Sequence, residues 1–124
     1  MKPVANTDRV VRSVATDAFT PWLDDDGNET GWSYMQLGDD FTPGVGFHMF
    51  KMEPGSTSTP HEHTGAEHFY VVDGTLIEND GTVYRKGDLV LMKKGTQHSS
   101  HTPDGCLLAV YIETMERNLP KNDA

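Results

Sequence analysis

Hydrophobic and polar residues alternate along most of this chain, in short stretches that are separated by turn-forming residues. A repeat of two residues is typical of β-strands, whereas an amphipathic helix repeats its apolar positions every three to four residues. No segment has a convincing helical period. The pattern predicts strands at residues 32–37, 45–52, 67–72, 75–78, 82–85, 89–92 and 107–112.

The two ends of the chain carry weaker signals. Residues 9–14 are β-prone, and residues 19–23 are expected to form an edge strand because Pro21 cannot donate a hydrogen bond to a neighbouring strand. The polar tail from Arg117 onward is expected to fray.

Turn signals divide the chain at short intervals. Asn79-Asp80-Gly81 predicts a hairpin, and Asp73-Gly74 predicts a turn just before it. Twelve glycines and seven prolines fit many short connections. A count of roughly eight to ten short strands indicates an all-β sandwich or barrel. We expect a single domain over residues 1–124, because this length is typical of one domain and the chain shows no repeat or long linker.

Charge and composition exclude several partners. The net charge of −9 repels phosphate backbones, so we expect no nucleic acid and no anionic membrane as a partner. No apolar stretch approaches the ~20 residues of a membrane span, and the N-terminus has no apolar region typical of a signal peptide. Cys106 is the only cysteine, which rules out an intramolecular disulfide. We therefore expect a cytoplasmic location.

A group of histidines and one carboxylate carries the chemistry. His61 and His63 are two residues apart, so on a strand both imidazoles point to the same face. Glu67 follows a short turn-forming stretch, and His98 lies far away in sequence after a glycine. Three imidazoles and one carboxylate suit one divalent ion such as Fe, Mn, Ni, Cu, Co or Zn.

The spacing around these residues resembles the first motif of the cupin superfamily, which spans residues 55–74 here. That motif is Gly, five residues, His-x-His, three or four residues, Glu, six residues and Gly. Gly55, His61, His63, Glu67 and Gly74 match it at every position.

The second cupin motif resembles residues 87–102. Gly87, Gly95 and His98 match it, whereas Lys93 replaces a proline and Thr102 replaces an asparagine. Neither replaced position is a metal ligand in the family, so the resemblance still implies a complete metal site.

The resemblance implies an all-β cupin jelly-roll barrel with the metal inside. The ion would be bound by His61 and His63 from one strand, Glu67 from the next and His98 across the barrel. An octahedral ion would keep two open positions for water, dioxygen or a small substrate. Glu67 could also act as a catalytic base if it detaches from the metal.

A narrower resemblance concerns residues 61–67 and 104–108. They are similar to the small cupins grouped with acetylacetone-cleaving dioxygenases and with zinc-binding anti-sigma factors. This group implies two hypotheses. One is a non-haem Fe(II) dioxygenase of a small carbonyl or enol compound, with an isomerase or decarboxylase also open. The other is a metal- or small-ligand-binding regulatory module without turnover. Cupins of this kind also often form homodimers, and we expect residues 9–23 to pair across the dimer axis.

The remaining histidines and the cysteine are expected to be structural. His48 could face the wall or the cavity, and a hydrogen-bonded structural role is the default. His68 should turn away from the metal because it follows Glu67, and His101 should also point outward. Cys106 is expected to be a buried, inert thiol. Six aromatic residues are candidates for pocket walls or core: Trp32, Tyr34, Phe47, Phe69, Tyr84 and Tyr111.

Overall fold

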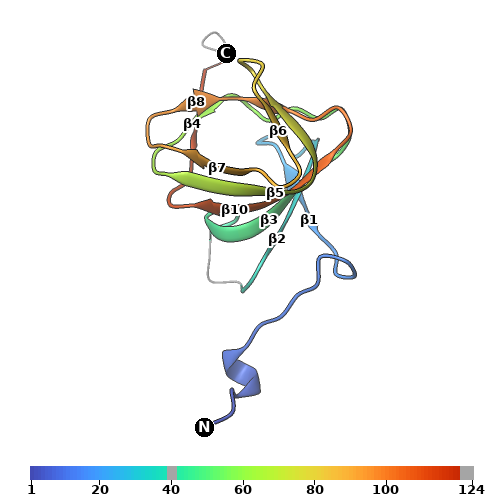
Figure 1. Ribbon diagram of the computed structural model, residues 1–124, viewed down its shortest axis with the longest axis vertical. Helices are drawn as coiled ribbons and strands as arrows, with labels where there is room; N and C mark the ends of the chain where they lie inside the picture. The colour runs from blue at the N-terminus through green and yellow to red at the C-terminus, as the bar shows by residue number, and fades with distance from the viewer. Residues whose placement is uncertain (39–41, 121–124) are drawn as a thin grey trace.

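The computed structural model describes residues 1–38 and 42–120, and nearly all of their regular structure is β-strand (Figure 1). One 3-10 helix, η1 (Asn6–Asp8), precedes the strands. The strands are β1 (Thr20–Leu23), β2 (Glu29–Gln36), β3 (Gly46–Met52), β4 (His61–Glu62), β5 (Glu67–Glu78), β6 (Val83–Arg85), β7 (Leu89–Met92), β8 (Gln97–His98), β9 (Ser100–His101), β10 (Cys106–Ile112) and β11 (Arg117–Asn118).

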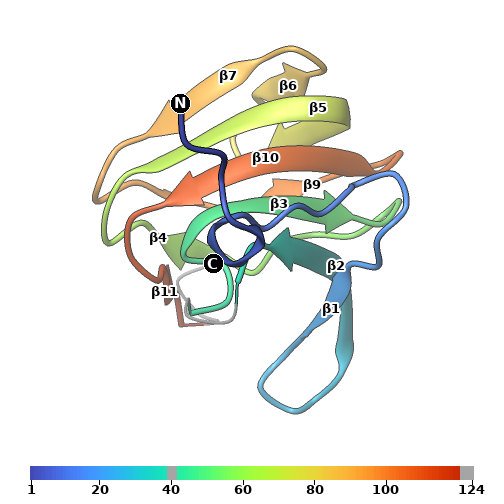
Figure 2. The same ribbon diagram turned by 90° about the horizontal axis from the view of Figure 1, so that it is seen from below.

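The strands form two antiparallel sheets that close into a barrel. The larger sheet has the order β1-β2-β3-β10-β5-β6, and β7 and β9 also pair with β5. The smaller sheet has the order β11-β4-β8. Figure 1 shows β4 and β8 on the opposite side of the barrel from β3 and β10, and Figure 2 shows β3, β10 and β5 side by side. The all-β jelly-roll barrel predicted from the sequence is therefore confirmed.

Strand alternation builds the core on the inner face of the larger sheet. In β5 and β10 every second residue is buried over most of the strand. Phe69 and Val71 from β5 pack with Leu108, Val110 and Ile112 from β10 in one apolar cluster. This wall is opposite the small sheet, so the barrel interior has one mostly apolar side and one side that carries three imidazoles.

The turn predicted at Asp73-Gly74 does not form, and β5 runs through it as a twelve-residue strand. The pairing of β5 with β10 shifts register between Leu107 and Leu108 instead, which indicates a β-bulge. Gly74 has a φ of +82°, and a Cβ there would lie 2.7 Å from the Cα of Cys106. Glycine is required at this bulge rather than at a chain reversal.

The ends of the chain also differ from the sequence prediction. Residues 9–14 form no strand; they belong to an exposed N-terminal arm that extends away from the barrel (Figure 1). Residues 19–23 do form an edge strand, β1, as predicted. The tail does not fray at Arg117, because β11 pairs with β4 and Leu119 donates its backbone N–H to the carbonyl of Pro60.

Candidate metal centre

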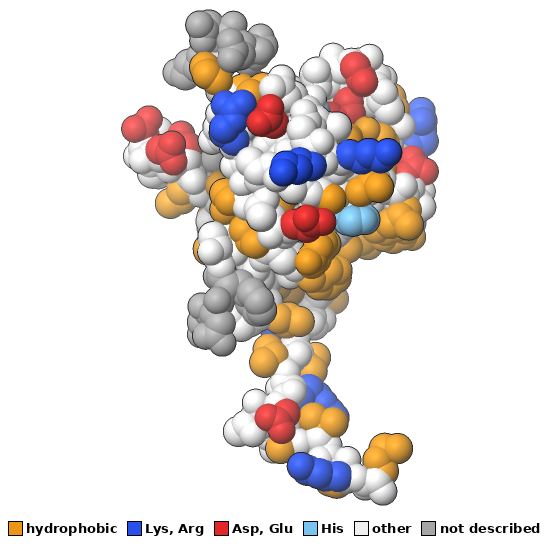
Figure 3. Space-filling model, turned by 90° about the vertical axis from the view of Figure 1, so that its left-hand side faces the viewer, with side chains coloured by type: hydrophobic (Ala, Val, Ile, Leu, Met, Phe, Trp, Pro, Cys, Tyr) orange, Lys and Arg blue, Asp and Glu red, His pale blue; other side chains and the backbone are white. Residues whose placement is uncertain are grey.

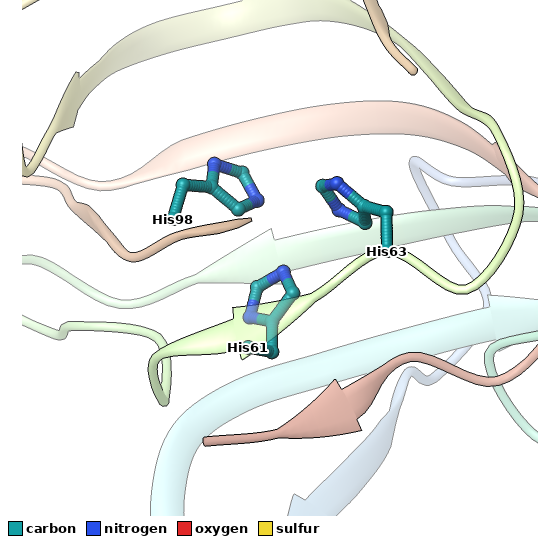
Figure 4. Close-up of side chains that lie close together, drawn as sticks. All are labelled: His61, His63 and His98. Atoms are coloured by element: carbon teal, nitrogen blue, oxygen red, sulfur yellow. The ribbon is translucent and has the colours of Figure 1, made fainter. Parts of the chain in front are cut away.

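Three histidines from the small sheet point toward one another (Figure 4). The register of β4 and β8 places His61 directly opposite His98, and His63 lies one residue beyond β4 on the same face. The ring centroids are 4.6 Å apart for His61 and His98, 5.1 Å for His61 and His63, and 4.7 Å for His63 and His98. His98 was expected across the barrel. It is instead on the strand next to His61, because β8 hydrogen-bonds to β4 in the same sheet.

Glu67 reaches the same point from the larger sheet, where it is the first residue of β5. Its Oε1 atom lies 3.2 Å from Nε2 of His63 and 4.0 Å from Nε2 of His98. The side chain of Glu67 is buried. The structure thus brings together all four residues that the sequence singled out.

The outward-facing nitrogens of the three rings all have partners that can only accept. Nδ1 of His61 lies 2.6 Å from the carbonyl of Thr59, and Nδ1 of His98 lies 2.7 Å from the carboxylate of Glu78. Nδ1 of His63 lies 2.9 Å from the hydroxyl of Thr96, whose own proton is donated to the carbonyl of Lys93. Each Nδ1 therefore carries its proton and donates it.

This tautomer leaves the Nε2 lone pairs directed inward, where they have too few donors. Nε2 of His63 and of His98 are buried and find no hydrogen-bond partner among the described residues. The Nε2 of His63 also faces a carboxylate oxygen of Glu67 at 3.2 Å, and two acceptors repel each other at this distance unless a cation is shared. Metal-binding histidines have this arrangement, with one nitrogen on the metal and the other fixed by an acceptor. The residues present therefore fit a divalent metal ion.

Burial controls the protonation of this centre. Desolvation by burial lowers the pKa of His61 to about 4, and repulsion from the nearby His98 and His63 adds to this effect. His61 is therefore neutral near pH 7. Burial alone would also lower the pKa of His98. The hydrogen bond to Glu78, followed by the charges of Glu78 and Glu67, outweighs burial and raises it.

A second carboxylate that the sequence reasoning missed lies beside these histidines. Oε2 of Glu116 is 3.2 Å from Nε2 of His61, and donor atoms of Glu116, His63 and Glu67 all lie within 4.8 Å of one another. Burial raises the pKa of Glu116 to about 7, and the charge of Glu67 adds to this effect. Glu116 lies outside both cupin motifs, immediately before the tail that was expected to fray. Only the pairing of β11 with β4 shows where it points.

A cavity of about 650 Å³ opens from this centre into the barrel. Most of its wall is apolar or aromatic, with Trp22, Trp32, Phe50 and Phe69 among the lining residues. Small-molecule sites are typically of this size and combine apolar walls with a few polar groups. The candidate metal ligands and the cavity therefore form one continuous site.

The other candidate residues divide between this cavity and the outside. His48 is buried, and its Nδ1 lies 3.0 Å from the carbonyl of Gly46. It also lines the cavity, so it has both a structural hydrogen bond and a face toward the cavity. His68 and His101 are exposed, as predicted. Cys106 is buried, and desolvation raises the pKa of its thiol to about 11, which agrees with the inert thiol that was expected.

The aromatic residues also divide between the two faces of the barrel wall. Trp32 and Phe69 line the cavity, whereas Phe47 and Tyr111 are exposed on the outside. Tyr84 packs edge-on against Phe69, with ring centroids 5.4 Å apart. Strand parity separates the inward pair from the outward pair, since neighbouring positions point to opposite faces.

Comparison with known proteins assigns the family. A family model described as the ChrR cupin-like domain matches residues 10–116. The chain belongs to this cupin family. A search of curated proteins finds no significant match.

Solved cupin structures share the fold of this family member. An acetylacetone dioxygenase from Acinetobacter johnsonii matches with a TM-score of 0.74 and 15% identity, over 100% of this chain and 85% of that one. An RmlC-like cupin from Ralstonia eutropha matches with a TM-score of 0.71 and 16% identity, over 90% and 73% of the two chains. A chain in the crystal structure of Rhodobacter sphaeroides SigE with the anti-sigma ChrR matches with a TM-score of 0.62 and 16% identity, over 80% of this chain and 50% of that one. Identities this low show the shared fold alone.

Within residues 1–38 and 42–120, no helix has the length and apolar character needed to cross a membrane.

Proposed function

We propose that this cupin binds one divalent metal ion and a small organic molecule beside it, and that with Fe(II) it is a dioxygenase of a small carbonyl or enol compound. The observation that carries the proposal is the position of the histidine and carboxylate cluster at the wall of a cavity of about 650 Å³ with a partly apolar lining. A purely structural metal site would be closed by its ligands and would have no such space beside it.

The side chains around the cavity have separable roles in this proposal. A bound divalent ion would supply Lewis acidity toward an oxygen of the ligand. The apolar wall of Trp32, Phe50 and Phe69 would exclude water and so strengthen electrostatic interactions with a developing enolate. His48 lines the same cavity, where its imidazole can donate or accept a proton. Glu67 would act as a base only when it is not bound to the metal.

The ligand set supports a range of metals rather than one. Three imidazoles with carboxylate suit Fe, Mn, Ni, Cu, Co and Zn. We propose iron for the enzyme, because His and carboxylate ligands with open positions are typical of non-haem Fe(II) oxygenases. The acetylacetone dioxygenase from Acinetobacter johnsonii shares the fold and fits this substrate class.

The second candidate is a regulatory module that binds a metal or small ligand without turnover. It is favoured by the family model, which is described by the cupin-like domain of ChrR, and by the match to the SigE–ChrR complex. Both candidates use the same cavity and its histidine cluster, and they differ in whether a bound ligand is converted.

Metal binding is tested by analysis of protein purified without a chelating tag. We expect about one equivalent of metal in the wild type and strong loss of metal from the His61→Ala, His98→Ala double variant. The matched control is His101→Ala, which removes an exposed histidine outside the cluster. Equal metal content in all three proteins would contradict the proposed centre.

Turnover is tested by oxygen consumption of iron-loaded protein with β-diketones, hydroxyketones and catechols. The dioxygenase predicts consumption with at least one of these classes in the wild type and none in the double variant. If a compound raises the melting temperature of the loaded protein but is not consumed, the result favours the regulatory binding module over the dioxygenase.

A further inference from the structure

We propose that Glu116 is a fifth protein ligand of the metal centre, supplied by the segment that joins β10 to β11. The inference rests on the proposed metal binding. It adds a ligand from outside the two motifs at residues 55–74 and 87–102, and it limits how a small molecule can reach the ion.

The backbone directs Glu116 toward the histidines. β11 pairs antiparallel with β4, with Asn118 opposite His61. Glu116 is two residues before Asn118, and His63 is two residues after His61. Residues two apart on paired strands point to the same face, so Glu116 lies on the face that carries both histidines. Asn118 lines the cavity as well, which agrees with this orientation.

Contacts on the outer face hold this register in place. Arg117 points away from the cavity, with a guanidinium nitrogen 3.4 Å from the carboxylate of Glu62. The side-chain amide of Gln97 on β8 donates to the same carboxylate at 3.0 Å. Leu119 donates its backbone N–H to the carbonyl of Pro60 at 2.9 Å. These contacts tie all three strands together, so the position of Glu116 follows from the sheet and not from a loose tail.

The contact between Glu116 and His61 needs a proton or a metal ion between its two acceptor atoms. Nδ1 of His61 donates to the carbonyl of Thr59, so its Nε2 carries a lone pair. Oε2 of Glu116 lies 3.2 Å from that Nε2. The pair of His63 and Glu67 repeats this arrangement at the same distance. In two imidazole–carboxylate pairs, the partners thus face each other through acceptor atoms. His63 belongs both to the group with His61 and His98 and to the group with Glu67 and Glu116.

The charge of the cluster also fits one divalent ion. Glu67 and Glu116 together carry two negative charges when ionised, and the donor atoms of these two residues and of His63 lie within 4.8 Å of one another. Two carboxylates this close in a buried site repel each other, and a divalent ion between them neutralises both.

A fifth ligand changes what the centre can bind. Four protein ligands leave two positions on a six-coordinate ion, whereas five leave one. A small molecule that binds through two oxygens would have to displace Glu116, while one that binds through a single oxygen would not. Glu116 would therefore select between these two kinds of ligand.

The test uses the full chain loaded with Mn²⁺, whose effect on water-proton relaxation reports how many exchangeable water molecules it binds. We expect one water for the wild type and two for Glu116→Ala. We also expect Mn²⁺ affinity, measured by competition with a chelator, to fall at least tenfold in Glu116→Ala and Glu116→Gln. The matched control is Glu113→Gln, an exposed carboxylate on the same connecting segment, which should keep the wild-type affinity and water count.

The outcomes separate this inference from the proposed function. A wild type that binds no divalent metal overturns both. A wild type that binds metal, with affinity and water count unchanged in both Glu116 variants, overturns only the fifth ligand. A fall in affinity without an added water overturns it too, because Glu116 would then act on a bound water. Metal-free Glu116→Gln should melt no lower than wild type, since it removes a buried carboxylate beside Glu67, and this keeps loss of folding distinct from loss of a ligand.

Discussion

Glu78 shows how much of the centre depends on residues that cannot touch the metal. It is buried at the end of β5, its Oε2 accepts from Nδ1 of His98 at 2.7 Å, and its Oε1 accepts from the hydroxyl of Ser100 at 3.3 Å. These two hydrogen bonds leave the carboxylate little freedom. His98 is therefore held in one tautomer and one orientation.

Replacing Glu78 with Gln should lower metal affinity by about 10–100-fold, the range found when such supporting hydrogen bonds are removed. The amide can donate to Nδ1 of His98 and so favour the tautomer whose Nε2 carries a proton. Chelator competition measures the affinity, with Glu113→Gln as the exposed control. Equal affinity in the two variants would show that the orientation of His98 does not depend on Glu78.

Gly74 carries a second requirement at the residue scale, and it concerns stability. Replacement by Ala should cost about 1–2 kcal/mol for the left-handed backbone and about 1–3 kcal/mol more for the clash with Gly105 and Cys106. Gly81→Ala is the matched control, because Gly81 has a φ of +90° and no described atom near the added Cβ.

Urea denaturation of the two glycine variants measures their free energies of unfolding. The control should lose only the backbone contribution. A loss in Gly74→Ala no larger than that in Gly81→Ala would mean that the chain relaxes around the bulge without cost.

The small sheet is the element on which the centre depends, and it is weak by itself. β4, β8 and β11 have two residues each, so few hydrogen bonds hold them together. His61 and His98 belong to this sheet, while Glu67 belongs to the larger one. A metal bound by all of these residues would join the two sheets.

Metal removal should therefore loosen the small sheet more than the rest of the barrel. We expect amide hydrogen exchange of residues 61–63, 95–98 and 116–119 to be faster in metal-free than in metal-loaded protein. Exchange in β10, which pairs on both sides, serves as the internal reference. Equal protection of the small sheet in both states would mean that its stability does not depend on the metal.

At the scale of the whole molecule, the outer face of the large sheet has apolar side chains that the rest of the described chain leaves exposed. The strand registers align Phe47, Tyr111, His68 and Leu91 in one row across β3, β10, β5 and β7. Phe47 is 60% exposed, Leu91 51% and Tyr111 46%. The N-terminal arm also exposes several valines, and Figure 3 shows apolar side chains both along the arm and on the adjacent barrel.

We predict that a second copy of the chain covers this row and arm, so that the protein is a homodimer. Light scattering at micromolar concentration should report a dimer for the wild type and a monomer for the Phe47→Asp, Leu91→Asp double variant. Leu37→Asp, a change at an exposed leucine outside the row and the arm, is the control and should stay dimeric. A monomeric wild type would contradict this prediction. The prediction no longer involves a strand at residues 9–14, since that segment belongs to the arm.

Local pattern and motif spacing were sufficient for the fold class and for four of the residues in the centre. The strand at residues 89–92 and the inward parity of His61 and His63 follow from a period of two, which depends only on backbone geometry. The same parity turned His68 outward. These features depend on neighbours in sequence, so the amino-acid sequence by itself determined them.

Tertiary structure alone showed that Glu78 and Glu116 belong to the centre. It also showed that His61 and His98 lie next to each other on paired strands. Each depends on which strands pair and in which register, and β11 pairs with a strand more than fifty residues earlier. The tail looked polar and unstructured because two residues are too few to show a period. The tail is ordered by its hydrogen bonds to β4 and by the ion pair between Arg117 and Glu62. A residue pattern within one segment contains no information about either contact.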